Sequence, residues 1–264
     1  MINPRQKQIL ELTERRGYVS IDALAALFDM TPQTVRRDVN NLCDQGLLLR
    51  QHGGASLPLM NSSYSQRNVE FVAEKTKIAD SVVSYLPDRA SIFLPLGTTV
   101  EAVARALAKT DKQLTIVTNS VEVARIFWTD TSFETVVTGG ILQQRNGGLI
   151  GQRAIDVCMD HRCDYAITGI GAIERDGTLL DFYEAEIAVM KAMHASARHH
   201  FVVADHTKFD RFAKRRLGHL SEIDCLFTDS AVPEPFIETT RKAGCEIVVA
   251  AAEANAAPLR HGYG

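Results

Sequence analysis

The sequence lacks the features that mark membrane, secreted and disulfide-rich proteins. No run among its 264 residues is apolar for long enough to span a bilayer, and the opening Met-Ile-Asn-Pro-Arg has no apolar signal core. The five cysteines are an odd number and include no Cys-x-x-Cys pair. These absences predict a reduced, cytoplasmic protein with buried thiols and no membrane partner.

Metal and nucleophile motifs are missing as well. Cys158, His161 and Cys163 lie close together, but their spacing matches no zinc motif and no second cysteine pair accompanies them. The eight histidines are scattered, and they form no arrangement with serine and aspartate that indicates nucleophilic catalysis. We therefore expect no metal, no cofactor and no catalytic triad.

Positive charge is also scarce. The formal net charge of −3 argues against a protein coated in positive charge, although it leaves room for a local basic face. Over residues 1–57, seven Arg and Lys oppose six Asp and Glu, which gives a formal charge of +1. Any affinity for nucleic acid must then come from the placement of these charges and from more than one copy at a binding site.

A complete helix start signal stands at Thr31. Its hydroxyl can cap free backbone N–H groups, and Pro32 occupies the first helical position, where its missing donor costs nothing. The apolar side of this helix consists of Val35, Val39 and Leu42. The other side carries side chains that reach base edges and phosphates, namely Gln33, Thr34, Arg36, Arg37 and Asn40. The pattern predicts the recognition helix of a DNA-binding domain.

Two shorter helices come before this one. Asn3-Pro4 opens the first, which extends to Gly17, and Ser20 caps the second, residues 21–28. Their inward residues are expected to be Ile9, Leu10 and Thr13 in the first helix and Leu24, Leu27 and Phe28 in the second. With the Asp29-Met30 turn, these helices make a helix-turn-helix unit.

A β-hairpin wing is predicted after Gly46, which ends the recognition helix. The strand Leu47-Leu48-Leu49-Arg50 leads into a Gly53-Gly54 turn and a return through Ala55-Ser56. The tip residues would touch the DNA backbone or the minor groove, and they are Arg50, Gln51 and His52.

The chain changes character after residue 57. Asn, Ser and Pro residues up to Gln66 indicate a linker, which we place at residues 58–72, between a DNA-binding domain at 1–57 and a sensing domain at 73–264. Residues 66–86 are typical of a helix whose inward residues are Val69, Val72, Ile78 and Val82. The residues from 254 onward are expected to be frayed.

Alternating strands and helices fill the second domain. Buried strands are expected at residues 91–94, 114–118, 133–138, 165–168, 201–204, 226–227 and 247–250, with helical patterns between most of them. Near-continuous apolar strands that alternate with helices are typical of a parallel sheet. The predicted fold class is α/β, with an N-terminal winged helix-turn-helix before a larger parallel-sheet domain.

Ligands of open parallel sheets bind at the carboxyl ends of the strands. Gly97-Thr98-Thr99 offers a flexible backbone, two hydroxyls and a helix N-terminus there, which suits a phosphate. Asp205 and Lys208 offer a carboxylate for hydroxyls and an ammonium for phosphate. Other strand ends let a ligand approach the main chain, at Thr118-Asn119, Gly139-Gly140 and Gly169-Ile170-Gly171. We expect a small phosphorylated, hydroxylated ligand at this edge.

Two alternatives to a ligand-controlled DNA-binding protein stay open at this point. A carboxylate among Asp181, Glu184 and Glu186 would serve as a base next to a carbonyl, which would make the chain a sugar-phosphate isomerase or deaminase with an appended interaction module. The three small helices would also suit a protein-interaction module, with Arg36 and Arg37 as a solvated face.

Several motifs resemble the DeoR family of bacterial transcription regulators. In the first domain they are Thr31-x-x-Thr34-Val35-Arg36-Arg37-Asp38-Val39 and Arg50-x-His52-Gly53-Gly54-Ala55. In the second they include Gly97-Thr98-Thr99-x-Glu101-Ala102-Val103-Ala104, Ile116-Val117-Thr118-Asn119 and Val203-x-Asp205-His206-x-Lys208-Phe209. The resemblance covers nearly the whole chain.

The resemblance implies a repressor rather than an enzyme. Family members assemble as dimers or tetramers, bind double-stranded operator DNA, and release it when a sugar phosphate binds to a domain related to ribose-5-phosphate isomerase. Carried over to this sequence, Thr98, Thr99 and Lys208 hold phosphate, while Asp205 and the Gly169 loop face hydroxyls. The expected effector is glycerol-3-phosphate.

Two departures from related sequences bear on these expectations. The isomerases carry two aspartates in an Asp-Gly-Ala-Asp loop, and the matching stretch here is Thr168-Gly169-Ile170-Gly171. Glu184 or Glu186 would then be what remains of the catalytic glutamate, without its partners, which favours sensing over turnover. Pro95 stands where aspartate is frequent in the family, so one hydroxyl contact to the effector would be lost.

Overall fold

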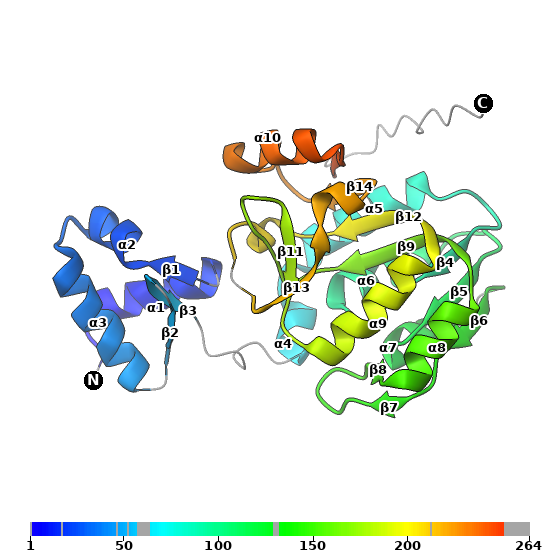
Figure 1. Ribbon diagram of the computed structural model, residues 1–264, viewed down its shortest axis with the longest axis horizontal. Coiled ribbons are helices and arrows are strands. Elements are labelled where there is room, and N and C mark those ends of the chain that lie inside the picture. Colours follow the sequence, from blue (N-terminus) through cyan, green and yellow to red (C-terminus); the bar gives the residue numbers. More distant parts are fainter. Residues whose placement is uncertain are drawn as a thin grey trace.

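The computed structural model describes residues 2–16, 18–45, 47–51, 53–56, 64–128, 132–211 and 213–250. Figure 1 shows a small N-terminal domain, drawn in blue, beside a larger domain built on a central sheet. Both predicted folds are present, a winged helix-turn-helix and a parallel α/β domain. Within these ranges no helix combines the length and the apolar character that crossing a bilayer requires.

The N-terminal domain contains the predicted helix-turn-helix. Its helices are α1 (Pro4–Arg16), α2 (Ile21–Phe28) and α3 (Pro32–Asp44). The predicted wing consists of β2 (Leu49–Gln51) and β3 (Gly54–Ser56), and β3 also pairs with β1 (Tyr18–Ser20), a strand too short to be apparent in the sequence. Gly17 and Gly46, the predicted helix ends, lie outside the described residues, as does His52 at the tip of the wing.

A close approach of β1 and β3 requires the second glycine of the predicted turn. A Cβ at Gly54 would lie 2.1 Å from the carbonyl oxygen of Val19, which is far inside van der Waals contact. Any side chain at Gly54 would therefore push the two strands apart. Gly53 has φ +76°, in the left-handed region that favours glycine.

The core of this domain includes the predicted stripe of α3, in which Val35, Val39 and Leu42 are buried. One predicted inward residue of α2 is wrong, since Leu27 is 57% exposed while Leu24 is 2% exposed. Almost every position of α2 is apolar, so spacing alone does not identify its packed side. The buried residues are Ile21, Leu24 and Ala25.

The helix predicted at residues 66–86 is two helices. They are α4 (Tyr64–Val69) and α5 (Val72–Tyr85), and α4 lies inside the interval 58–72 suggested as a linker. Phe71 adopts a left-handed conformation, with φ 53°, and turns the chain between them.

This turn changes which side chains face the core. Ile78 and Val82 of α5 are fully buried, as predicted. Val69 and Val72, which flank the turn, are exposed, so the prediction that they face inward is wrong. The apolar periodicity of residues 66–86 predicts one continuous helix, because the sequence has no glycine or proline at the turn between α4 and α5.

A seven-stranded parallel sheet forms the centre of the larger domain, in the order β15-β14-β12-β9-β4-β5-β6. Its strands lie in the predicted regions and are β4 (Ser91–Phe93), β5 (Thr115–Thr118), β6 (Glu134–Val137), β9 (Cys163–Gly169), β12 (Ala197–Val203), β14 (Cys225–Thr228) and β15 (Glu246–Val249). Between them lie α6 (Thr98–Leu107), α7 (Val121–Trp128), α8 (Gln152–Asp160), α9 (Glu184–Ala195) and α10 (Glu234–Ala243).

Two small antiparallel sheets were not predicted. One pairs β7 (Ile141–Leu142) with β8 (Leu149–Ile150), and the other contains β10 (Ala172–Ile173), β11 (Thr178–Asp181) and β13 (Arg215–His219). Most of these strands are too short for an alternating pattern. Single 3-10 turns follow β12 and β13, namely η1 (His206–Lys208) and η2 (Leu220–Glu222).

Helices cover both faces of the central sheet (Figure 1). On one face α5, α6 and α7 pack on the strands through a cluster that includes Ile78, Val103 and Ile116. On the other face α8 and α9 pack through Cys158 and Val189. Burial on both faces explains why the strands read as apolar runs.

The strand order reverses its direction between β4 and β9. The chain moves outward from β4 through β5 to β6 on one side, and from β9 through β12 and β14 to β15 on the other. Open α/β sheets bind ligands outside the carboxyl ends of the strands at such a switch point. Gly97 lies in the loop after β4 and Gly169 ends β9, so both residues lie at this switch point.

Leu24→Ala and Leu27→Ala test the packing of α2. We expect Leu24→Ala to lower the free energy of unfolding by about 2–5 kcal/mol, because it opens a cavity in the core. Leu27→Ala should change it by at most about 0.5 kcal/mol, because the side chain is mostly in water. Urea unfolding followed by circular dichroism measures both, and equal losses would contradict the burial described for this helix.

Candidate functional site

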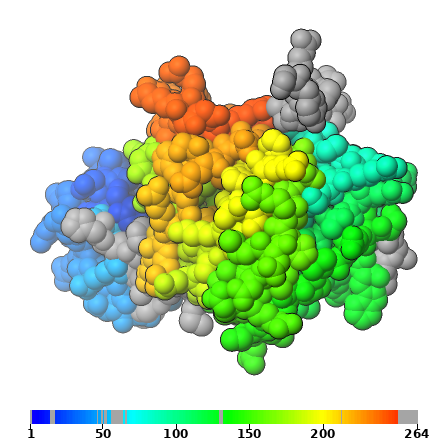
Figure 2. Space-filling model, turned by 45° about the vertical axis from the view of Figure 1, so that its right-hand side comes forward, coloured from blue at the N-terminus to red at the C-terminus, as the bar shows by residue number. Residues whose placement is uncertain are grey.

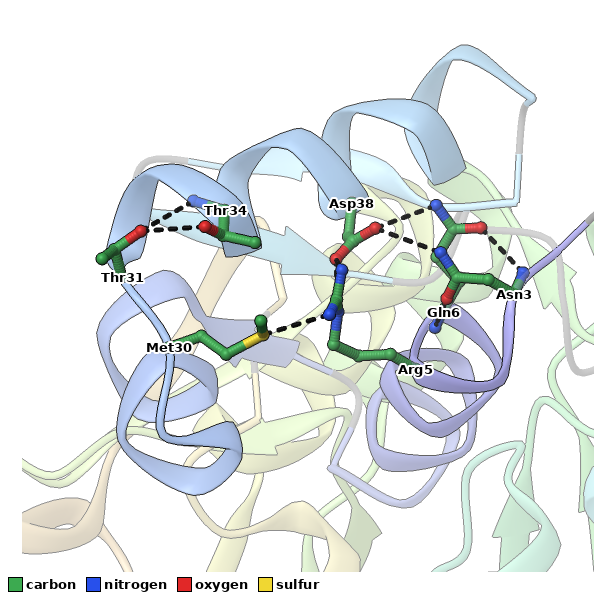
Figure 3. Close-up of polar contacts among 7 residues, drawn as sticks. All are labelled: Asn3, Arg5, Gln6, Met30, Thr31, Thr34 and Asp38. Carbon is green, nitrogen blue, oxygen red and sulfur yellow. Dashed lines mark hydrogen bonds and ion pairs between the residues drawn. The ribbon is translucent and has the colours of Figure 1, made fainter.

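Helix α3 begins with the predicted cap. The hydroxyl of Thr31 accepts a hydrogen bond from the backbone N–H of Thr34 at 3.3 Å, and the two threonine hydroxyls lie 2.9 Å apart (Figure 3). Gln33, Arg36 and Arg37 are exposed, while Thr34 and Asn40 are half-buried. Within the described residues neither arginine pairs with a carboxylate, so both guanidinium groups face solvent.

A buried carboxylate on α3 was not singled out from the sequence. Asp38 accepts hydrogen bonds from Arg5 Nε at 2.6 Å and from Gln6 Nε2 at 3.1 Å, and Asn3 Nδ2 lies 3.4 Å away (Figure 3). These partners belong to α1 or directly precede it. Asp38 therefore ties the recognition helix to α1. The signal was available, because Asp38 interrupts the apolar side of α3 between Val35 and Val39.

Arg50 of the wing lies beside Asp44 at the end of α3. Its Nη2 is 3.2 Å from Asp44 Oδ1, and both side chains are mostly exposed. An exposed ion pair of this kind contributes about 0–1 kcal/mol. Arg50 is therefore available to a phosphate at little cost.

The sheet brings four of the predicted strand ends together. Asp205, Gly169, Gly97 and Thr118 follow or end β12, β9, β4 and β5, which are neighbours in the sheet. Val100 of α6 lies between the two glycines, because a Cβ at Gly97 or at Gly169 would be 3.5 Å or 3.6 Å from its Cγ2. The start of α6 thus faces the switch point.

Thr98 and Thr99 form the first turn of α6 at this point, and Thr99 is buried. Gly97 before them has φ +148° and offers no capping side chain. The first backbone N–H groups of a helix have no partner within it, and they carry the positive end of its dipole. An anion at the switch point would meet these groups.

Thr118 and Asn119 are fully buried and make internal hydrogen bonds. The Thr118 hydroxyl donates to Leu94 O at 2.6 Å. Asn119 accepts from Leu96 N at 3.1 Å and donates to Leu149 O at 2.9 Å. These bonds fix the loop before α6, so the two side chains shape the edge rather than face a ligand.

Gly139 and Glu184 lie apart from the other predicted residues. Gly139 follows the edge strand β6 and packs beside Arg153 of α8. Glu184 is exposed at the start of α9, where it lies 3.0 Å from Arg215. The structure does not bring either residue to the switch point, because one sits two strands away and the other points to solvent.

Asp205 and Lys208 lie together on the turn after β12. Lys208 Nζ is 3.6 Å from Asp205 Oδ2, and Asp205 also accepts hydrogen bonds from the hydroxyl and backbone N–H of Thr207. Burial lowers the pKa of Lys208 to about 8 against the opposing effect of Asp205. Burial alone would raise the pKa of Asp205, but Lys208 and Thr207 outweigh it and hold the pKa below its usual value.

Three further cations lie close to this pair and were not predicted. They are Arg67 of α4, Lys75 of α5 and Arg211, and each acts on the pKa of Lys208 by lowering it. Burial also lowers the pKa of Lys75 and of Arg211. No sequence pattern points to Arg67 and Lys75, because only the fold brings the chain before β4 to the turn after β12.

Asp181 is the second carboxylate of this group. Burial raises its pKa to about 6, although Arg67 and Lys208 act in the opposite direction. Asp181 Oδ1 accepts a hydrogen bond from Phe182 N at 2.7 Å. Four cations, Arg67, Lys75, Lys208 and Arg211, thus share one electrostatic neighbourhood with three carboxylates, Glu70, Asp181 and Asp205.

Glu186 is held by two donors. Arg145 pairs with its Oε1, and Asn146 Nδ2 donates to the same atom at 2.9 Å. The Arg145 guanidinium in turn lies over the ring of Tyr183, 3.1 Å from the centroid. Glu186 thus links the turn between β7 and β8 to the start of α9, as a structural contact does.

The cysteines do not form a metal site. Cys158 and Cys163 are buried, and burial raises the pKa of each to about 12, so neither is a ready thiolate ligand. In the part of the chain that the structure describes, no group of three or more His, Cys, Asp or Glu is arranged to hold a metal ion.

Asp38→Ala tests the tie between α1 and α3. We expect it to lower the free energy of unfolding by about 1–3 kcal/mol, because it leaves Gln6 and Arg5 without their acceptor. Asp44→Ala, which removes a carboxylate that is 68% exposed from the same helix, should change it by about 0–1 kcal/mol. Thermal unfolding of the two variants side by side makes the comparison, and a loss for Asp44→Ala as large as that for Asp38→Ala would refute the tie.

Two protein-family models match the chain. The DeoR-like helix-turn-helix domain matches residues 5–59, and the DeoR C terminal sensor domain matches residues 70–230. The HTH-type transcriptional repressor CsqR of Escherichia coli is 43% identical, over 94% of this chain and 95% of that protein. The glycerol-3-phosphate regulon repressors of Haemophilus influenzae and Escherichia coli are 41% and 39% identical, over 93% and 87% of this chain and 96% and 91% of theirs.

Some solved structures share part of the fold. Ribose 5-phosphate isomerase A of Methanocaldococcus jannaschii has a TM-score of 0.39 and 18% identity, over 53% of this chain and 55% of that one. The delta subunit of eIF2B from Chaetomium thermophilum has a TM-score of 0.45 and 15% identity, over 60% of this chain and 56% of that one.

The curated relatives agree with the expectation of a regulator rather than an enzyme, since they are named as transcriptional repressors. Together the two family models reach from residue 5 to residue 230, and the relatives cover most of the chain at 39–43% identity. The chain belongs to the DeoR family of transcription regulators.

Proposed function

We propose that this protein is a transcriptional repressor that binds operator DNA through α3 and releases it when a small phosphorylated polyol occupies the switch point. The observation that supports a phosphorylated effector is the excess of positive charge at Arg67, Lys75, Lys208 and Arg211. We place the DNA-binding domain at residues 1–57 and the sensing domain at 73–264.

The exposed side of α3 supports the DNA-binding part of the proposal. Gln33, Arg36 and Arg37 project from the helix, and Thr31, Thr34 and Asn40 lie beside them. Arginine is well suited to guanine edges and phosphates, and Gln and Asn to adenine. Arg50 and His52 on the wing would contact the DNA backbone.

We also propose that the protein acts as a dimer or tetramer. Residues 1–57 carry a formal charge of only +1, so a single domain has little electrostatic affinity for DNA. Two recognition helices in a symmetric oligomer would contact two half-sites of one operator.

The charges at the switch point support a phosphorylated effector. The four cations outnumber the carboxylates of Glu70, Asp181 and Asp205 by one, and this excess of positive charge favours an anion such as a phosphate. Such an anion would lie between Lys208 and the first turn of α6, at Thr98 and Thr99. Asp205 is placed to accept hydrogen bonds from hydroxyl groups of the same ligand.

Glycerol-3-phosphate is the effector that we propose first. Two of the relatives are named glycerol-3-phosphate regulon repressors. Pro95, buried directly after β4, offers no side-chain acceptor, so the hydroxyls of a polyol would depend on Asp205 and the Gly169 loop. A three-carbon ligand with two hydroxyls needs few such contacts.

A gel-shift titration tests this function. DNA from upstream of the gene cluster that encodes the protein would be titrated with and without millimolar glycerol-3-phosphate at fixed salt. We expect specific binding that the ligand releases. DNA binding that glycerol-3-phosphate leaves unchanged would support a repressor but exclude this effector. Absence of DNA binding at any salt concentration would exclude the proposed repressor function.

Arg37→Ala tests base reading by α3. We expect operator affinity to fall by about 1–3 kcal/mol if Arg37 contacts a base, with a smaller loss on random DNA. Lys242→Ala removes one positive charge from α10, far along the chain, and should leave operator affinity unchanged. Fluorescence anisotropy on both DNAs provides the measurement, and an unchanged affinity in Arg37→Ala would exclude the contact.

The pKa of Lys208 predicts how effector affinity depends on pH. The cationic form binds the phosphate, and with a pKa of about 8 it is lost as the pH rises through that value. We expect the affinity for glycerol-3-phosphate to fall about tenfold between pH 7 and pH 9. Asp181, with a pKa of about 6, is already ionised over this range and adds no slope.

Isothermal titration calorimetry at pH 7, 8 and 9 measures this dependence. Lys208→Arg carries a charge that does not titrate in this range, so it should flatten the profile. An equally steep profile in Lys208→Arg would assign the effect to another group, of which Lys75 is the nearest candidate.

A further inference from the structure

Helix α4 joins the two domains and is held by contacts to the sensing domain. It is six residues long, too short to be stable alone, and the chain reaches it from β3 through residues 57–63. The Tyr64 hydroxyl at its start donates to Glu101 of α6, which is fully buried and also pairs with Arg105. The position of α4 thus depends on its surroundings.

The end of α4 is bound to α5 by a buried lysine. Lys75 Nζ donates to the carbonyl oxygens of Arg67 and Glu70, the latter at 2.7 Å. Phe71 at the corner lies edge-on to the ring of His206, with centroids 5.4 Å apart. His206 belongs to η1, the turn that carries Lys208. The corner between α4 and α5 therefore packs on the turn that we assign to the effector.

Arg67 brings a positive charge from α4 to that turn. Its charge acts on the pKa of Lys208, Arg211 and Asp181, and the corner that follows it packs on η1 through Phe71 and His206. Arg67 Nε is buried and has no hydrogen-bond partner among the described residues, and the same holds for Asp205 Oδ2. A buried guanidinium nitrogen without an acceptor costs free energy, and an anion between these cations would supply the acceptor.

We propose that Arg67 is a direct ligand of the anionic group of the effector, together with Lys208 and Arg211, and that this contact fixes α4 when the effector binds. The inference rests on the proposed function for the identity of the effector. The inference goes beyond the proposed function because it assigns a residue that binds the phosphate group to the segment leading to the DNA-binding domain.

The arrangement explains how occupancy would reach the recognition helix. Without an anion, the positive charge of Arg67 is repelled by those of Lys75, Lys208 and Arg211. A dianion reverses the sign of this interaction and draws α4 toward η1. Because residues 57–63 connect α4 to the wing, the set of positions open to the DNA-binding domain changes with occupancy.

Arg67→Gln is the variant that tests the proposal, and Lys77→Gln is the matched control. Lys77 is an exposed cation on the neighbouring helix α5, so its loss changes the net charge equally. Calorimetry would use glycerol-3-phosphate and, separately, inorganic phosphate as the probe. We expect Arg67→Gln to weaken the binding of both about ten- to hundred-fold, Arg67→Lys to restore part of it, and Lys77→Gln to leave it unchanged.

A second measurement separates binding from release. Operator affinity without effector should be the same in Arg67→Gln and in the unmodified protein. At concentrations that give equal occupancy by calorimetry, Arg67→Gln should retain operator that the unmodified protein has released. A merely structural role of Arg67 would instead lower the unfolding temperature without any ligand present.

The outcomes distinguish this inference from the proposed function. Equal affinity of Arg67→Gln and the unmodified protein for both probes overturns the inference but does not contradict the proposed effector. Binding of inorganic phosphate but not of glycerol-3-phosphate rejects that effector, while the phosphate comparison still decides the role of Arg67. If the unmodified protein binds neither probe, the anion site is wrong and both proposals fall.

Discussion

The sensing domain is organised around an excess of positive charge that the fold keeps away from water. Four cations, Arg67, Lys75, Lys208 and Arg211, outnumber the three carboxylates of Glu70, Asp181 and Asp205, and burial lowers the pKa of three of these cations. Like charges in a poorly solvated site repel one another, and the packed sheet and its helices must hold them in place. The surrounding fold therefore keeps these cations near one another, and an anion bound among them would relieve their repulsion.

The N-terminal domain contains a buried negative charge instead of a cluster of positive ones. Asp38 is enclosed between α1 and α3, and its oxygens are satisfied by Arg5 and Gln6 (Figure 3). Asp38 is thereby removed from the exposed side of α3, where Asp44 at the end of the helix is the remaining exposed carboxylate. In Figure 2 the blue surface of this domain meets the yellow and orange surface of the larger domain, and α1 lies in contact with η1.

The sequence predicted those parts of the structure that depend on short-range order. The cap at Thr31 and the stripe of α3 follow from spacing within one helix, and the meeting of Gly97, Gly169 and Asp205 follows from the parallel sheet. Leu27 is exposed because tertiary packing, not periodicity, decides which side of the apolar helix α2 is buried. Val69 is exposed because the chain turns at Phe71. Arg67 and Lys75 were missed because residues far apart in sequence meet only after folding.

The reversal of strand order between β4 and β9 also bears on how the protein folds. The start of α6 comes from the half of the sheet that is made first, whereas Asp205 and Lys208 come from the half that is made last. During synthesis the DNA-binding domain is complete well before both halves of the ligand site exist. Under the function proposed above, a newly made chain would complete its DNA-binding domain before its effector site, and bound effector would stabilise only the fully assembled sheet.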